Sequence, residues 1–311
     1  MATELKELFG HLAGYAAVVG FVVVVTLVVW LARKGVLRKA GPFEFRAPDG
    51  NAARAESTRD EDCGGSDLRP AGVVRLYDVG NAKQFYTEIA PNYDLNNSAN
   101  LLATHMEVIE RIKQARAPKR RLQVLDLGSG TGERVATFFL NDPRVRWTAI
   151  DFCQAMVGRF QQHLAGRPLD QRPSVYNEDL NNVHHLLPRG AYDVVLLNLV
   201  LSSMPELPDF RQISKLVAPG GRLIISDINP SYARTHPHYK ATTADSDLVA
   251  LRIHPVEPLE VATRAKEAGL HLSEMGRIGS ADTSYSFIVV FANTVRPGKG
   301  YDSPDTRTRP A

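Results

Sequence analysis

Residues 124–135 read VLDLGSGTGERV, and this stretch decides the fold of the chain. An apolar run reaches an acid at Asp126, and glycines follow at positions 128, 130 and 132. Glycine adopts left-handed backbone conformations without strain and lets a ligand approach the main chain closely. The stretch therefore predicts a strand, a tight turn that holds a ligand, and the start of a helix.

Two common nucleotide-binding loops do not fit this spacing. A dinucleotide-binding turn reads G-x-G-x-x-G, and Glu133 stands where its third glycine would be. A phosphate-binding loop needs G-x-x-x-x-G-K-[ST], and the chain has no such run. A carboxylate at Asp126, aimed into the turn, would repel a phosphate and attract a cation. The spacing therefore favours a ligand that carries an ammonium or sulfonium group.

Apolar runs of strand length alternate with helical patterns along residues 75–295. We expect strands at 121–128, 145–151, 174–180, 192–201 and 220–228, and a closing pair at 270–278 and 283–293. The expected helices are 132–141, 153–164, 208–217 and 258–269, with an irregular stretch before the last one. Alternation of this kind predicts an α/β fold whose parallel sheet is covered by helices on both faces. The closing pair predicts an antiparallel edge.

Polar residues end the expected strands. Asp151, Asp179 and Asn198 each follow an apolar run. In an open α/β sheet, ligands bind at the carboxyl ends of the strands. Asp151 could accept both hydroxyls of a ribose, and Asp179 could accept the amino group of an adenine.

Five segments in the right order resemble class I S-adenosylmethionine-dependent methyltransferases of the small-molecule type. They are VLDLGSGTG, the Asp of AIDF, the Asp of NEDL, YDVVLLNLVLSSMPE and LVAPGGRLIISDI, and the resemblance spans about residues 80–292. It implies a Rossmann-like sheet of seven strands, mostly parallel with an antiparallel C-terminal hairpin. It also implies S-adenosylmethionine as the cofactor. The contacts that it implies are Tyr93, Asp126, Gly128, Ser129, Gly130, Gly132, Asp151, Phe152, Met156, Asp179, Leu180 and Asn198, with Tyr86 as a further aromatic candidate.

The chain departs from this family after the expected fourth strand. Many small-molecule relatives carry a His-His-Leu-Pro-type run there, whereas residues 202–205 read SSMP. A histidine base at that place is therefore absent. Candidates for catalysis lie instead in the stretch before the last helix, at His236, His238 and Tyr239. The alternative is that this stretch is a proline-rich surface loop with solvated histidines. No carboxylate or thiol accompanies the histidine pair, so we expect no metal.

The N-terminal part predicts a membrane anchor. Residues 12–32 contain no formally charged side chain, and about 20 apolar residues suffice to cross a bilayer as a helix. A cleaved signal peptide would need a basic N-terminal region, whereas Glu4 and Glu7 precede this span. Basic residues follow it, so the positive-inside rule places the C-terminal bulk in the cytoplasm. We expect a short tail at 1–11, the span at 12–32, a basic juxtamembrane segment and flexible linker at 33–74, the catalytic domain at 75–295 and a disordered tail at 296–311.

Composition limits the remaining functions. The formal net charge is only +3, which does not predict a nucleic-acid partner. The two cysteines, Cys63 and Cys153, are far apart and predict neither a disulfide framework nor a zinc site. We expect a membrane-anchored methyltransferase that acts on a small or lipid-like acceptor. A non-catalytic S-adenosylmethionine-binding scaffold and another transferase using the same nucleoside pocket stay open, as does the oligomeric state.

Overall fold

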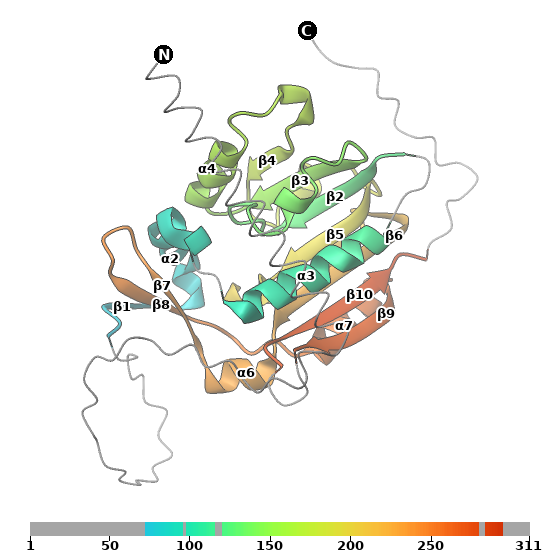
Figure 1. The fold of residues 1–311 in the computed structure, drawn as a ribbon. Helices are drawn as coiled ribbons and strands as arrows, with labels where there is room; N and C mark the ends of the chain where they lie inside the picture. The colour runs from blue at the N-terminus through green and yellow to red at the C-terminus, as the bar shows by residue number, and fades with distance from the viewer. Residues whose placement is uncertain (1–71, 96–97, 116–119, 280–283, 295–311) are drawn as a thin grey trace, which may run out of the picture. The chain divides into compact units, whose positions relative to one another are not determined.

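The computed structural model describes residues 72–95, 98–115, 120–279 and 284–294 (Figure 1). These ranges all fall within one compact unit, Ser66–Ala311. The predicted span at 12–32, most of the linker and the tail at 296–311 lie outside the described residues. Within the described ranges, no helix combines the length and the apolar character that a membrane crossing requires.

A seven-stranded sheet forms the centre of this unit. Its strands are ordered β4-β3-β2-β5-β6-β10-β9, and those from β4 to β6 run parallel. β10 pairs antiparallel with both β6 and β9. The bounds are β2 Leu122–Leu127, β3 Val145–Asp151, β4 Ser174–Asn177, β5 Tyr192–Asn198, β6 Val217–Ile228, β9 His271–Ile278 and β10 Ser286–Ala292. The predicted Rossmann-like sheet with an antiparallel C-terminal hairpin is confirmed.

Successive residues of the central strands enter two different cores. Val124 and Leu125 follow each other in β2 and are both fully buried, one in each core. This explains why the strands are continuous apolar runs rather than alternating ones. The helices α3 (Ala99–Gln114) and α4 (Gln154–His163) cover one face of the sheet, and α5 (Phe210–Ser214) and α7 (Pro258–Glu267) cover the other. Figure 1 shows α3 lying across the sheet.

The predicted helix at 132–141 is wrong. A series of turns replaces it, with a single short 3-10 helix, η4, at Ala136–Phe138. The apolar residues whose spacing predicted a helix are Val135, Ala136 and Phe139. The turns bury all three against the sheet. The turns remain bonded to the glycine turn, because the Thr137 N–H donates to the Gly132 carbonyl at 3.3 Å.

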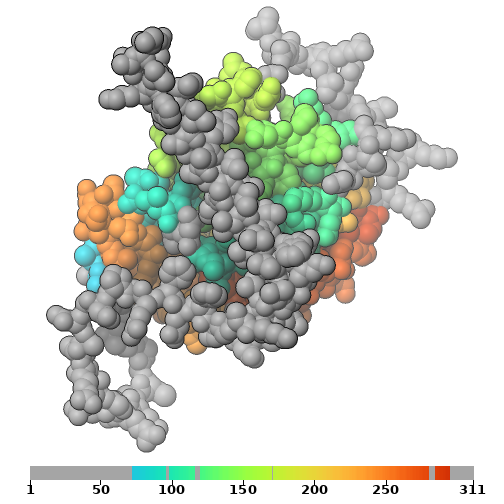
Figure 2. Space-filling view, in the orientation of Figure 1, coloured from blue at the N-terminus to red at the C-terminus, as the bar shows by residue number. Residues whose placement is uncertain are grey.

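The stretch expected to be irregular is ordered and contributes to a second, smaller sheet. The stretch begins with the short helix α6 (Pro230–Thr235) and continues as the antiparallel hairpin of β7 (His238–Thr242) and β8 (Leu248–Arg252). β8 also pairs in parallel with β1 (Arg75–Tyr77), which precedes α2 (Ala82–Ile89). The hairpin buries Val249 and Leu251 in the same cluster as Phe85 of α2. Figure 2 shows the hairpin in orange beside the cyan residues of α2.

Candidate active site

The main cavity lies at the carboxyl ends of β2, β3 and β5, where sheet order reverses between β2 and β5. It has a volume of about 280 Å³. A smaller cavity of about 40 Å³ adjoins it around the glycine turn, because both are lined by Tyr93, Gly128 and Gly130. The two cavities bring together all twelve cofactor contacts expected from the sequence: Tyr93, Asp126, Gly128, Ser129, Gly130, Gly132, Asp151, Phe152, Met156, Asp179, Leu180 and Asn198.

The glycine turn requires glycine for two separate reasons. Gly128, Gly130 and Gly132 have φ values of +78°, +56° and +70°, which side-chain-bearing residues rarely adopt. A Cβ on Gly132 would also lie 2.3 Å from the ring of Phe160 in α4. The turn is tied to the next strand, because the Gly130 N–H donates to Asp151 Oδ2 at 2.8 Å. The glycine motif thus both leaves room in the cavity and fixes the backbone that forms its floor.

Two buried carboxyls face this turn. Asp126 and Asp151 are only 4% and 6% exposed. Burial, and after it the charge of Asp151, raises the pKa of Asp126 to about 7. Burial raises the pKa of Asp151 to about 6, although the backbone N–H groups of Cys153 and Gly130 oppose the shift. Both carboxyls would ionise more readily beside a cation, so the pair fits a positively charged ligand.

The opposite charge is supplied by Arg134, which the sequence analysis missed. Arg134 lines the smaller cavity together with Asp126. Its Nη2 donates to the Tyr93 carbonyl at 3.3 Å, and its guanidinium lies 5.8 Å from the centre of the Tyr93 ring. An acid and a guanidinium in one small cavity match the ammonium and carboxylate of an amino acid. Nothing in the sequence separates Arg134 from the other arginines.

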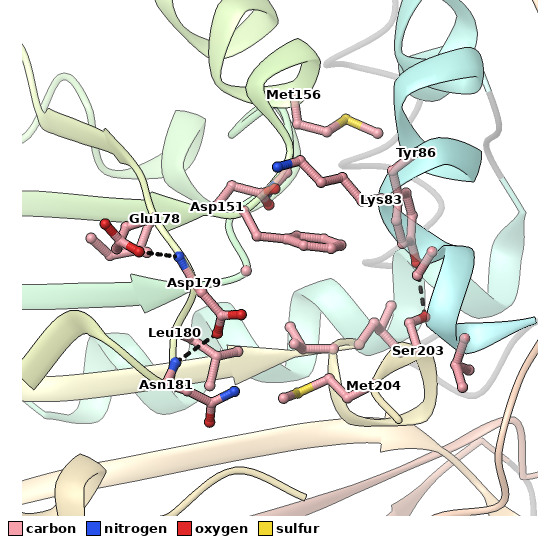
Figure 3. Close-up of a pocket in the computed structure, with 18 of the residues that line it drawn as sticks. Lys83, Tyr86, Asp151, Met156, Glu178, Asp179, Leu180, Asn181, Ser203 and Met204 are labelled. Carbon is pink, nitrogen blue, oxygen red and sulfur yellow. Dashed lines mark hydrogen bonds between the residues drawn. The ribbon is translucent and has the colours of Figure 1, made fainter. Parts of the chain in front are cut away.

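The far end of the main cavity holds Asp179 and Leu180, which follow β4, together with Met156 of α4 (Figure 3). Asp179 is exposed, and its Oδ1 accepts from the Asn181 N–H at 2.8 Å. The Asp179 N–H in turn donates to Glu178 Oε1 at 2.9 Å. These bonds hold the loop after β4 at the cavity, with one carboxylate oxygen of Asp179 left over for a ligand. Lys83 and Glu178 also line the cavity and were not predicted.

Comparison with known proteins fits this geometry. The family model described as "Methyltransferase domain" matches residues 102–274, which is more than half of the chain. The chain belongs to this family.

Curated relatives of this methyltransferase are distant. A ubiquinone/menaquinone biosynthesis C-methyltransferase of Dinoroseobacter shibae is 21% identical over 52% of this chain and 66% of the relative. A ubiquinone biosynthesis O-methyltransferase of Caulobacter sp. is 31% identical over 39% of this chain and 46% of the relative. The match thus spans between about half and two thirds of these two relatives. Among solved structures, the [4+2]-cyclase SpnF has the same fold, with 15% identity, a TM-score of 0.50, and coverage of 72% of this chain and all of the cyclase.

The cofactor of the methyltransferase is S-adenosylmethionine, and the residues present fit it. The buried acids Asp126 and Asp151 suit its sulfonium and ammonium charges, and Arg134 suits its carboxylate. Asp151 and Asp179 lie where the ribose and adenine would be expected from the resemblance. The individual contacts of the twelve cofactor residues stay predictions.

A third cavity, of about 40 Å³, lies beside the first two. We call it the tyrosine chamber, because Tyr86, Tyr93, Tyr239 and Tyr285 line it. It shares Tyr93, His105 and Arg134 with the cavity around the glycine turn, so the two are adjacent. The rest of its lining is four aliphatic residues and two serines, which are Leu101, Leu199, Ile228, Ile253, Ser202 and Ser203.

Tyr86 connects the chamber to the segment that departs from the family pattern. Its hydroxyl lies 2.8 Å from Ser203 Oγ, as Figure 3 shows, so α2 is bonded to the turn after β5. Ser203 belongs to the short 3-10 helix η7, Leu201–Ser203. Burial raises the pKa of Tyr86 well above its ordinary value, so this hydroxyl stays protonated. The chain therefore places a tyrosine–serine pair in the segment after β5.

The three catalytic candidates from the sequence are separated in space. His236 is exposed, with its ring stacked on Tyr232 at 4.1 Å and its Nδ1 2.9 Å from the Thr235 hydroxyl. His238 is half-buried in β7, where burial and the nearby Arg252 and Lys240 lower its pKa.

Neither histidine lines the three cavities, and only Tyr239 reaches the tyrosine chamber. A base must come within hydrogen-bond reach of the proton it removes, so the position of these histidines does not support that role. Neighbouring residues of a strand point to opposite faces, which separates His238 from Tyr239. The catalytic roles of the three residues stay predictions. In the described ranges, no cluster of three or more His, Cys, Asp or Glu residues could hold a metal ion.

Proposed function

We propose that this chain transfers a methyl group from S-adenosylmethionine to a small acceptor with a planar, largely apolar ring. The observation that carries the proposal is the position of the tyrosine chamber beside the amino-acid end of the cofactor cavities. Four tyrosines and four aliphatic side chains provide ring faces and edges on several sides. Aromatic side chains favour other rings in stacked or edge-to-face arrangements, which suits a planar acceptor.

The chemistry needs mainly alignment. Bound S-adenosylmethionine supplies a methyl group whose bond to sulfur breaks, with the electron pair on sulfur, as the acceptor forms the new bond and releases a proton. Holding the two reacting atoms near 3 Å can lower the barrier by several kcal/mol. The glycine turn and Asp151 fix one partner, and the tyrosine chamber fixes the other. A protein base is needed only if the acceptor binds with its proton still in place.

We further propose that residues 12–32 anchor the chain in a membrane and that the catalytic domain faces the cytoplasm. The support is the uncharged apolar run and the basic side chains that follow it, among them Arg33, Lys34 and Arg38. A tether of this kind raises the effective concentration of an acceptor that partitions into the same bilayer. By their names, two relatives are methyltransferases of ubiquinone or menaquinone biosynthesis, which agrees with such an acceptor.

Methyl transfer into membrane extract tests the acceptor class. The full chain is incubated with S-adenosylmethionine labelled in the methyl group, and label is counted in the lipid-soluble and water-soluble fractions. We expect label in the lipid-soluble fraction and none with Asp151→Ala. Retained cofactor binding without any transfer would contradict the proposal and favour the scaffold. Equal transfer to vesicle-borne acceptor after deletion of residues 1–46 would contradict a functional anchor.

Thiol labelling tests the orientation. Cys63 lies in the linker, whereas Cys153 is fully buried and serves as an internal control. A membrane-impermeant maleimide should label Cys63 only after the cells are permeabilised. Strong labelling of intact cells would place the domain on the outside and reject the cytoplasmic orientation.

A further inference from the structure

His105 is a buried polar residue that nothing above uses. It lies on α3, is 6% exposed, and lines both the tyrosine chamber and the cavity around the glycine turn. Its Nδ1 lies 3.0 Å from Asn198 Nδ2. Its Nε2 is buried and makes no hydrogen bond to any residue that the structure describes. A buried polar atom without a partner is costly, so its persistence points to a bound group that completes the bond.

The hydrogen bonds around Asn198 decide which nitrogen of His105 carries the proton. Asn198 Oδ1 accepts from the Ser226 hydroxyl at 2.7 Å. In this arrangement the amide turns its NH2 toward His105, and Nδ1 accepts that bond. Burial, and after it the charge of Arg134, lowers the pKa of His105 to about 4. The ring is neutral near pH 7, and its single proton is on Nε2.

The titratable side chains of the chamber favour binding of a negatively charged ligand oxygen. None of those described below acts as a base that would take its proton. Nε2–H is a donor, and the charge of Arg134 is felt at the same ring. Burial raises the pKa values of Tyr86 and Tyr285, so their hydroxyls stay protonated and uncharged. A hydrogen-bond donor held in position stabilises an oxyanion.

We propose that His105 binds the methyl acceptor by donating Nε2–H to an oxygen of a hydroxylated aromatic ring that is held as the phenolate. This inference rests on the proposed function and narrows its acceptor class. The phenolate has lost its proton to solvent on binding, so its oxygen can take the methyl group without a base on the protein. If a ring carbon takes the methyl group instead, the hydrogen on that carbon must then move through solvent to the oxygen, which restores the aromatic ring. This accounts for a site in which neither loop histidine reaches the reacting atoms.

A coloured phenol tests the proposal without turnover. The probe is 4-nitrophenol, whose neutral and ionised forms absorb at different wavelengths. It is titrated into the full chain saturated with S-adenosylhomocysteine, for the wild type, His105→Phe and His105→Gln. Phenylalanine keeps the ring shape and removes the donor, whereas glutamine keeps a donor on a flexible chain. The affinity for S-adenosylhomocysteine is measured for each variant as a check on folding.

The wild type should bind the probe as phenolate and lower its apparent pKa by about one unit. His105→Phe should bind it about tenfold more weakly and lose the shift, the loss expected for one hydrogen bond. His105→Gln should recover part of both. Equal affinity and ionisation in His105→Phe would overturn the proposal. A wild type that binds S-adenosylhomocysteine but not the probe would overturn this acceptor class and leave methyl transfer standing. Absence of S-adenosylhomocysteine binding would overturn both.

Discussion

Asp126, one residue before the end of β2, and Asp151, the last residue of β3, are buried carboxyls on neighbouring strands. The charge of Asp151 adds to burial in raising the pKa of Asp126 to about 7. The pKa of Asp151 itself rises to about 6. Unfolded aspartates titrate near 3.9, so the empty folded domain holds more protons than the unfolded chain between about pH 4 and 7. These two groups therefore make the empty domain less stable as the pH rises through that window.

Cofactor binding should reverse this dependence. A sulfonium and an ammonium favour the ionised acids, so the affinity for S-adenosylmethionine should rise between pH 5 and 8. For each proton that binding releases, the affinity should rise by up to about tenfold per pH unit. Calorimetry in buffers with different ionisation enthalpies measures that release. S-adenosylhomocysteine, which lacks the sulfonium charge, should show a shallower rise, and Asp126→Asn should flatten both. An unchanged pH profile in Asp126→Asn would contradict the electrostatic interpretation.

Replacing Asp151 should abolish most cofactor binding. Asp151 accepts from the N–H groups of Gly130 at 2.8 Å and Cys153 at 2.9 Å, so Asp151→Ala loosens the turn as well as removing the charge. We expect affinity for S-adenosylmethionine to fall at least about a hundredfold. Asp193→Ala is the matched control, because Asp193 is also a buried acid of the sheet but bonds to Arg120 and the Gln123 N–H. It should lower stability by about 1–3 kcal/mol and leave affinity unchanged. Equal losses of affinity would remove the special role of Asp151.

Two glycines should respond to alanine in opposite directions. Gly132→Ala places a Cβ 2.3 Å from the Phe160 ring at a φ of +70°, so it should cost about 2 kcal/mol or more. Gly158 lies inside α4 with no atom within 4 Å of its added Cβ, so Gly158→Ala should stabilise the domain by about 0.5–1 kcal/mol. Urea unfolding of the full chain measures both. Similar free energies for the two variants would show that the turn tolerates a side chain.

The Tyr86–Ser203 bond should slow cofactor release. It joins α2 to the turn after β5 across the main cavity, so Tyr86→Phe should speed the dissociation of S-adenosylhomocysteine severalfold. Tyr77→Phe removes a comparable bond, that between Tyr77 and Glu88 at 2.7 Å, from the same region outside the cavity. Stopped-flow displacement should find its rate unchanged. A Tyr86→Phe rate equal to that of the wild type would assign the bond a purely structural role.

The cofactor half of the site could be predicted from local sequence. β3 and β5 each run through a buried apolar stretch to a polar residue, Asp151 in β3 and Asn198 in β5. Strand ends of a parallel sheet share one edge, so those residues had to meet there. The spacing of the glycines added the turn. Local constraints were enough for these residues, whereas Tyr93, Phe152, Met156 and Leu180 were expected only from the family resemblance.

The acceptor half could not be predicted in the same way. The small sheet depends on Arg75 pairing with Val249, far apart in the chain, and β1 has only 3 residues. His105 is a single histidine within a helix pattern, and its chemistry arises only because α3 packs over the end of β5 beside Asn198. The helix expected after the glycine turn failed because its apolar residues could be buried by turns.

The division between the two sheets has a consequence for how such an enzyme can change. The methyl donor is held by the ends of the large sheet, whereas Tyr239 and Ile253 enter the chamber from the β7–β8 hairpin and its exit. If the chamber binds the acceptor as proposed, one contiguous segment carries much of the discrimination between acceptors. Exchange of that segment between homologues, by recombination or by design, could redirect the enzyme to new compounds while its donor chemistry stayed intact.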